Sequence, residues 1–382
     1  MPTDPYDLPD AHLGDVASFE SLRPGTRWTL EATALYPPYR PPRIVAGYAP
    51  RERLSAARIA QPESWILESP TVDSVGISLL ADARVFPGRI RRRMPKHHEW
   101  GQMLLTANGE RLPASLSTIG GNGTLPVSVD LDAPSERLDG THFFLGSLHP
   151  HFGHFLVEGL ARVWAWRRVA DLHPDARLLV YEPGLPRFGT RLLELAGVET
   201  DRLLFLQNTV EVDRLYVPDV AMRTHRWVSN PMGETWQHMA SRIDDGPAVT
   251  PTRRVFLSRR SVANRPLVNT DEIEGLFESH GFEIIAPETL DVIEQIRLAR
   301  SSSTLAGCVG SQMYLAAFQH RAARNLVLAP SNFYLRDDSL LADALDHDLA
   351  VCFGTAADFS TQERAWSIDH RIVEQGIRAV AD

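Results

Sequence analysis

Three histidines, His149, His151 and His154, lie within six residues of the sequence. An amphipathic run follows them and carries Glu158 and Arg162 at steps of four residues after His154. Residues spaced by four are neighbours on a helix surface, so His154, Glu158 and Arg162 are expected to form one polar stripe. A carboxylate beside an imidazole either orients the ring or accepts a proton itself, and both arrangements provide a general base.

Two other interpretations of this stretch remain open from the sequence. The stripe also fits a solvated helix face on which Glu158 and Arg162 form an ordinary ion pair. The three histidines also fit a metal site in a loop stiffened by Pro150, but the sequence offers no defined fourth ligand. We therefore expect no metal here, and none at residues 130–132, an Asp-Leu-Asp pattern in a turn-rich stretch.

A second polar group follows the strand-like segment RVFLS. Arg259, Arg260 and Arg265 come at the expected carboxyl end of this strand, which is where ligands of open α/β sheets bind. Guanidinium groups bind phosphate through paired hydrogen bonds, so the cluster predicts a phosphate-bearing ligand; solvated loop arginines are the alternative. Asn269 and Glu272 have the spacing of a capping box, which predicts that a helix begins there.

The segment LAGCVGSQMYLAAF predicts a strand, a tight turn and a helix. Gly310 allows the backbone to approach a ligand, and Ser311 and Gln312 begin a helix whose first N–H groups attract anions. One Gly-Ser pair is a weak motif, and a simple packing turn accounts for it as well.

Alternating strands and helices are expected to position these residues. The apolar pattern alternates between residues 140 and 207 and again from residue 254 to about 330, which predicts two α/β units with parallel, helix-covered sheets. The best linker candidate is 244–254, which contains two prolines and lacks periodicity. Before residue 140, short alternating runs and the Asn-Gly pair at 108–109 predict strands and a hairpin.

Composition excludes several classes of protein. The net charge of −9 argues against a general nucleic-acid binder. No segment approaches the roughly 18 consecutive apolar residues of a membrane-spanning helix. Two cysteines, Cys308 and Cys352, are too few for a disulfide framework and fit a reducing compartment. We expect a cytoplasmic protein, with peripheral attachment to the inner face of the membrane as an open alternative.

Three segments, in their order and spacing, resemble the family 61 glycosyltransferases of capsule and lipopolysaccharide loci. They are GHFLVEGLAR at 153–162, FLSRR with NRPLVNTDEI within 256–273, and GFEIIAP through SQMYLAAF at 281–318. LLTANGERL fits the family's N-terminal hairpin more loosely. The resemblance implies a GT-B architecture: two Rossmann-like domains facing across a cleft, with a β-rich N-terminal extension.

Composition and pattern predict the domain boundaries, and the resemblance implies the role of each domain. We expect a flexible tail at 1–25, an acceptor-side α/β domain at 26–243 and a donor-binding domain at 254–360. The remaining residues, 361–382, are expected to form a terminal helix, and such helices in GT-B proteins often pack back on the first domain.

By this resemblance, the activity is sugar transfer with inversion at the anomeric carbon. His154 and Glu158 match the catalytic positions, and His149, His151 and Arg162 are acceptor-side candidates. The donor-side and phosphate-binding candidates are Arg259, Arg260, Arg265, Asn269, Gly310, Ser311 and Gln312. The implied partners are a nucleotide-sugar donor and a glycan or lipid-linked glycan acceptor, with no nucleic acid, no metal and no cofactor.

Two positions depart from the family pattern. Many members have His where this chain has Val309, and many have Asn where it has Tyr314. These two changes affect the positions expected to contact the donor. The sequence also leaves open the sugar, the nucleotide, the acceptor, the linkage and the oligomeric state. Two alternatives remain: a hydrolase with a histidine-bound metal, and a non-catalytic nucleotide-binding protein with the same fold.

Overall fold

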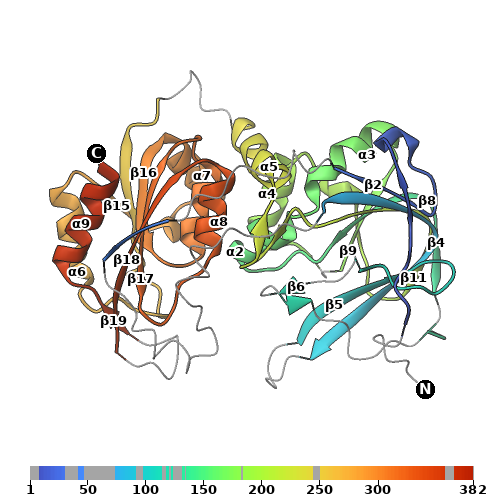
Figure 1. Cartoon of the computed structure of the whole chain (residues 1–382), viewed down its shortest axis with the longest axis horizontal. Coiled ribbons are helices and arrows are strands. Elements are labelled where there is room, and N and C mark those ends of the chain that lie inside the picture. Colours follow the sequence, from blue (N-terminus) through green and yellow to red (C-terminus); the bar gives the residue numbers. More distant parts are fainter. Residues whose placement is uncertain are drawn as a thin grey trace. The chain divides into compact units, whose positions relative to one another are not determined.

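The computed structural model describes residues 8–30, 42–46, 74–91, 98–113, 118–119, 122–123, 131–133, 135–181, 184–243, 250–357 and 365–381. The chain divides into two compact units, one comprising Met1–Tyr36 and Val72–Thr235 and the other Pro37–Thr71 and Trp236–Asp382. Each unit contains a sheet with parallel strands and packed helices, so the protein is mixed α/β (Figure 1).

The sheet of the first unit has the order β1-β2-β4-β11-β8-β9-β10, and β5 pairs with β4. Its carboxyl-terminal half, β11-β8-β9-β10, is parallel, whereas β4 is antiparallel to β2, β5 and β11. The strands are β1 (Gly14–Val16), β2 (Thr26–Thr29), β4 (Gly76–Arg91), β5 (His98–Leu105), β8 (Glu136–Gly146), β9 (Arg177–Val180), β10 (Leu203–Phe205) and β11 (Val210–Pro218).

Helices and two short hairpins complete the first unit. The hairpins are β6 (Thr118–Ile119) with β7 (Asn122–Gly123) and β12 (Met222–Arg223) with β13 (Trp227–Val228). The helical elements are η2 (Phe19–Ser21), α2 (Phe152–His154), η5 (Phe155–Gly159), η6 (Val163–Ala165), α3 (Trp166–Leu172), α4 (Gly189–Leu195) and η7 (Thr200–Arg202), with α5 (Asn230–Ser241) at the boundary.

The expected flexible tail at 1–25 is ordered from residue 8 onward, and residues 1–7 lie outside the described residues. β1 pairs with β2, and the side chain of Phe19 is buried against the rings of Trp28 and Tyr216. Burial of one aromatic side chain contributes about 2–3 kcal/mol, which favours ordering this segment. The polar, proline-rich composition of this segment did not indicate that Phe19 would be buried.

The sheet of the second unit has the order β15-β14-β16-β17-β18, all parallel. β3 (Arg43–Ala46) and β19 (Trp366–Ser367) pair with different parts of β18. The main strands are β14 (Arg253–Leu257), β15 (Glu283–Ile285), β16 (Ser302–Cys308), β17 (Arg324–Pro330) and β18 (Asp348–Ala356).

Helices cover both faces of this second sheet (Figure 1). α6 (Thr270–Ser279) and α9 (His370–Ala381) pack together on one face, while α7 (Val292–Ser301), η9 (Ser311–Phe318) and α8 (Asp337–Ala344) lie on the other. A short turn, η8 (Pro287–Thr289), precedes α7. No helix within the described residues is long and apolar enough to span a bilayer.

Two segments lie in a different unit from the one expected. β3, assigned from the sequence to the first domain, is parallel to β18 in the second sheet. The terminal helix α9 buries Val373, Ile377 and Val380 in the core of the second unit instead of returning to the first domain. Both placements result from pairing and packing between residues distant in sequence, which a local pattern does not encode. Most of the expected linker, 244–249, lies outside the described residues.

Candidate active site

The helical segment that carries His154 and Glu158 is irregular. One turn of α2 leads into η5, a π-helical turn in which the N–H of Leu160 donates to the carbonyl of Phe155 at 3.0 Å. The sequence predicted a continuous helix over 152–170, because the apolar pattern reveals the buried face but not an inserted residue. Single π turns inside helices are rare and are frequent at functional sites.

His154 and Glu158 are in direct contact within this turn. Nδ1 of His154 lies 2.6 Å from Oε2 of Glu158, and the hydroxyl of Thr224 donates to the other carboxylate oxygen at 2.6 Å. The side chains of His154 and Glu158 are 35% and 14% exposed, so the imidazole reaches solvent while the carboxylate is largely covered. The three side chains form a hydrogen-bonded chain that ends at the more exposed ring.

The partners assign the proton on the imidazole. An ionised carboxylate only accepts hydrogen bonds, so Nδ1 of His154 carries the proton that it shares with Glu158. In the neutral ring Nε2 then carries the lone pair. This is the arrangement in which a carboxylate orients a histidine that acts as a base.

The other two histidines lie beside this pair. The rings of His149 and His151 have their centroids 4.7 Å and 5.6 Å from that of His154, and the backbone N–H of His151 donates to Nδ1 of His149 at 3.1 Å. Within the residues that the structure describes, no group of three or more His, Cys, Asp or Glu side chains is arranged to hold a metal ion.

Arg162 is buried, although the sequence predicted a position on the polar stripe. Its side chain donates from Nε to the carbonyl of Pro218 at 3.1 Å and stacks over the ring of Phe144. The π turn shifts the helical phase after Glu158, and this shift turns Arg162 into the interior. Burial lowers the pKa of the guanidinium to about 10, so Arg162 still carries its charge at neutral pH.

In the second unit, two of the predicted arginines converge on Gly310. Arg259 follows β14, and a Cβ atom at Gly310 would overlap its Nη1 and approach Nη2 of Arg265 to 3.8 Å. Gly310 has φ 148° and ψ 178°, a conformation essentially reserved for glycine. Arg265 is in the left-handed region with φ 53° and stacks over the ring of Phe333 at 4.2 Å.

The position of this arginine pair follows from the strand order. β14 and β16 are neighbours at the point where the order of the parallel sheet reverses, and Arg259 and Gly310 lie just beyond their carboxyl ends. In open α/β sheets a ligand crevice forms at this point. The amide of Gln312 donates to the carbonyls of Leu257 and Cys308, which holds the two strand ends together.

The family model of glycosyltransferase 61 matches residues 152–326. The chain carries a glycosyltransferase 61 domain. This match confirms the resemblance seen in the sequence, and the protein is a glycosyltransferase. The matched residues include the His154–Glu158 pair and the arginine pair at Gly310. No curated protein matches the chain.

Other predicted donor-side residues of the glycosyltransferase make internal contacts. Arg260 forms ion pairs with Asp271 and Glu274 of α6. Asn269 precedes α6, but its amide exchanges hydrogen bonds with the backbone of Ile368 and makes no side-chain cap, so the expected capping box is wrong at this helix. Ser311 opens η9, which is a 3-10 helix.

The two positions that depart from the family pattern are also buried in the glycosyltransferase. Val309 is 2% exposed, and the hydroxyl of Tyr314 donates to Asp337 at 3.1 Å. Tyr314 therefore ties η9 to the start of α8. Beside it, Asp338 is buried with neither carboxylate oxygen in a hydrogen bond to the described residues. Burial and the neighbouring Asp337 raise the pKa of Asp338 well above its usual value.

Thr224 is the residue of the candidate site that the sequence did not reveal. It lies 66 positions from Glu158, in the hairpin formed by β12 and β13. A lone threonine carries no motif, so only its position in space identifies it. Arg259 and Arg265, by contrast, are predictable from the sequence because they follow a strand.

Proposed function

We propose that the protein transfers a sugar from a nucleotide-sugar donor to a hydroxyl group of a glycan or lipid-linked glycan, with inversion and without a divalent metal. The proposal includes a role in surface-polysaccharide assembly. The observation that supports it is the hydrogen-bonded chain Thr224–Glu158–His154 within a glycosyltransferase 61 domain, in which Glu158 contacts the His154 imidazole.

The base step is assigned to His154. Nε2 removes the proton from the acceptor hydroxyl as its oxygen forms a bond to the anomeric carbon of the donor sugar. The bond from that carbon to the diphosphate oxygen breaks on the opposite face, and its electron pair leaves with the nucleoside diphosphate. Glu158 keeps the ring oriented and stabilises the imidazolium that forms.

The leaving diphosphate is assigned to Arg259 and Arg265. Guanidinium groups bind phosphate oxygens through charge-assisted hydrogen bonds and stabilise the negative charge that develops as the bond breaks. The backbone at Gly310 lacks a Cβ and allows a phosphate to approach closely. Positive charge supplied by side chains replaces that of a metal ion, which is why we propose metal independence. A GT-B architecture with two Rossmann-like domains completes the proposal.

The test is Glu158→Gln, assayed by release of free nucleotide from a panel of nucleotide sugars. Glutamine keeps the size of the side chain but removes its charge, so turnover is expected to fall about 10²–10⁴-fold. Calorimetric binding of UDP, GDP and CDP is expected to stay unchanged. Full turnover in Glu158→Gln would remove this carboxylate from the mechanism.

A matched pair of arginine variants tests the donor side of the proposal. Arg259→Ala should weaken binding of the preferred nucleotide, whereas Arg260→Ala should not, because Arg260 is paired with Asp271 and Glu274. Equal effects of the two substitutions would show that the nucleotide does not bind at Gly310. Turnover that survives exhaustive chelation supports metal independence, and turnover restored only by a divalent ion contradicts it.

A further inference from the structure

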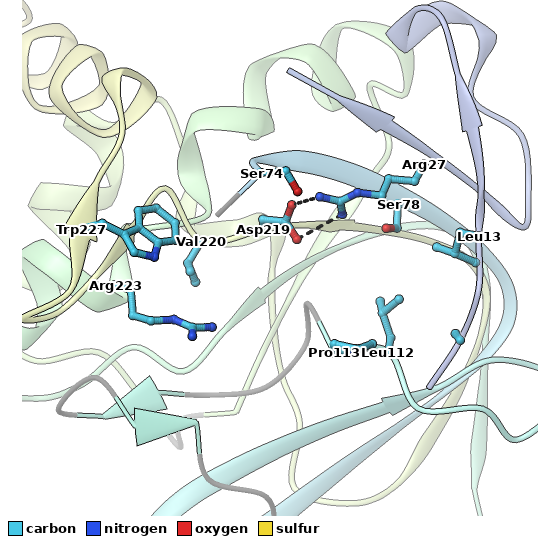
Figure 2. A pocket seen from close by; sticks show the side chains of 11 residues that line it. Leu13, Arg27, Ser74, Ser78, Leu112, Pro113, Asp219, Val220, Arg223 and Trp227 are labelled. Carbon is cyan, nitrogen blue, oxygen red and sulfur yellow. Dashed lines mark hydrogen bonds and ion pairs between the residues drawn. The ribbon is translucent and has the colours of Figure 1, made fainter. Parts of the chain in front are cut away.

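The first unit contains a pocket of about 310 Å³ that the proposed chemistry does not use. Its volume is at the lower end of the range for small-molecule sites, which suits a single sugar ring. Figure 2 shows Arg223 extending from the β12–β13 hairpin toward the space beside the Arg27–Asp219 pair. Trp227, Ser74 and Ser78 contribute further to the wall.

The pocket wall is about equally polar and apolar, and its described charged residues are Arg27, Asp219 and Arg223. Arg27 donates to Oδ1 of Asp219 at 3.2 Å, and the backbone N–H of Gly76 donates to Oδ2 at 2.7 Å, so the carboxylate is held by its own partners. Arg223 adds a second guanidinium, so the described residues of the wall include two arginines and one aspartate. Such a wall favours an anionic ligand. Trp227 is also among the lining residues, although only 4% of it is exposed.

The same segment that lines the pocket also holds the helical turn of the proposed base. The carbonyl of Asp219 accepts from the indole N–H of Trp164 at 3.0 Å, and the N–H of Ala221 donates to the carbonyl of Ala161 at 2.6 Å. Thr224, the residue after Arg223, donates to Glu158. Arg223, which lines the pocket, is therefore the immediate neighbour in sequence of the residue that donates to Glu158.

We propose that this pocket binds an acidic sugar of the acceptor, whose carboxylate or phosphate group is recognised by Arg223. This inference rests on the proposed function and deepens it, because it names the chemical class of the acceptor. An acidic unit in the pocket anchors the acceptor chain while a neighbouring unit presents its hydroxyl to His154. Specificity for the acceptor then comes from residues of the first unit and does not depend on which nucleotide the donor carries.

The test measures binding without turnover, by ligand-observed NMR with methyl glucuronoside, glucose 6-phosphate and methyl glucoside. At least one acidic sugar should bind with a dissociation constant on the order of 1 mM and the neutral glucoside should bind at least 10-fold more weakly. The two acidic probes distinguish a carboxylate from a phosphate. Equal binding of neutral and acidic sugars, or no binding of any of them, would overturn the proposal.

Variants place the binding in this pocket. Arg223→Met should weaken acidic-sugar binding about 10-fold or more, whereas Arg226→Met, an exposed arginine of the same hairpin, should leave it unchanged. Ser74→Glu adds a carboxylate at an exposed position of the wall and should abolish binding without affecting folding. Acidic-sugar binding that survives both Arg223→Met and Ser74→Glu refutes the assignment. Calorimetry with UDP, GDP and CDP on the same preparations reports separately on the donor site.

Discussion

Replacement of Gly310 by alanine adds a single atom, Cβ, and tests whether the proposed donor site lies there. The added Cβ would overlap Nη1 of Arg259, which is the end of a flexible side chain and is able to move away. The fold should therefore survive, while the guanidinium is displaced from the carboxyl end of β14. The backbone at φ 148° also disfavours alanine, at a cost of about 1–3 kcal/mol.

The expected magnitude for Gly310→Ala follows from the contact that is lost. A hydrogen bond to a charged group contributes about 1.5–3 kcal/mol, which corresponds to a weakening of nucleotide diphosphate binding by about 10- to 150-fold. Isothermal titration calorimetry with UDP, GDP and CDP measures this change directly. Thermal unfolding of the same samples measures the backbone strain separately.

Gly281→Ala is the matched control for this experiment. Gly281 has φ 77° and lies in the same unit, and a Cβ added there would have none of the described atoms within 4 Å beyond its chain neighbours. This variant should lose stability of the same order without any change in nucleotide affinity. If Gly310→Ala binds every nucleotide as tightly as the wild type does, the arginine pair is not the phosphate site and the reasoning fails.

Two further predictions concern the base and a buried carboxyl group. Thr224→Val removes the hydrogen bond from Thr224 to Glu158 and should lower turnover about 10-fold with unchanged nucleotide binding. Unchanged turnover would show that the carboxylate does not need this hydrogen bond. The raised pKa of Asp338 means that the folded protein keeps a proton that the unfolded chain loses near pH 4, so stability from this group is lost as pH rises. Asp338→Asn should therefore gain urea resistance relative to the wild type between pH 5 and 8, whereas a pH-independent difference would contradict the buried, protonated carboxyl group.

Much of the second unit was predictable because its signals are local. The apolar runs that became β14, β16 and β17 are short and bounded by polar turns, and α6 and α7 show helical spacing. Positions just after such strands fall at the carboxyl edge of a parallel sheet. The sequence therefore predicts Arg259 and Gly310 as ligand-side residues.

Other features of the fold depend on contacts between residues distant in sequence. β3 joins β18 across about 300 residues of chain, and α9 packs on the second unit because its apolar face matches that core. The pocket in the first unit is likewise formed by segments that include Arg27, Ser78 and Arg223. The periodicity of a single segment does not indicate which distant segments it will contact.

The sequence by itself determined the chemical groups and their order along the chain: a histidine and a glutamate four residues apart, arginines after one strand and a glycine after the next. The tertiary structure decided which of these groups act together. Arg162 follows a π turn and lies in the interior. Arg260 forms an ion pair with α6. The β12–β13 hairpin places Thr224 in hydrogen-bond contact with Glu158. The physical reason is that residue type and local spacing fix what a side chain can do, whereas helical phase and long-range packing fix what it touches.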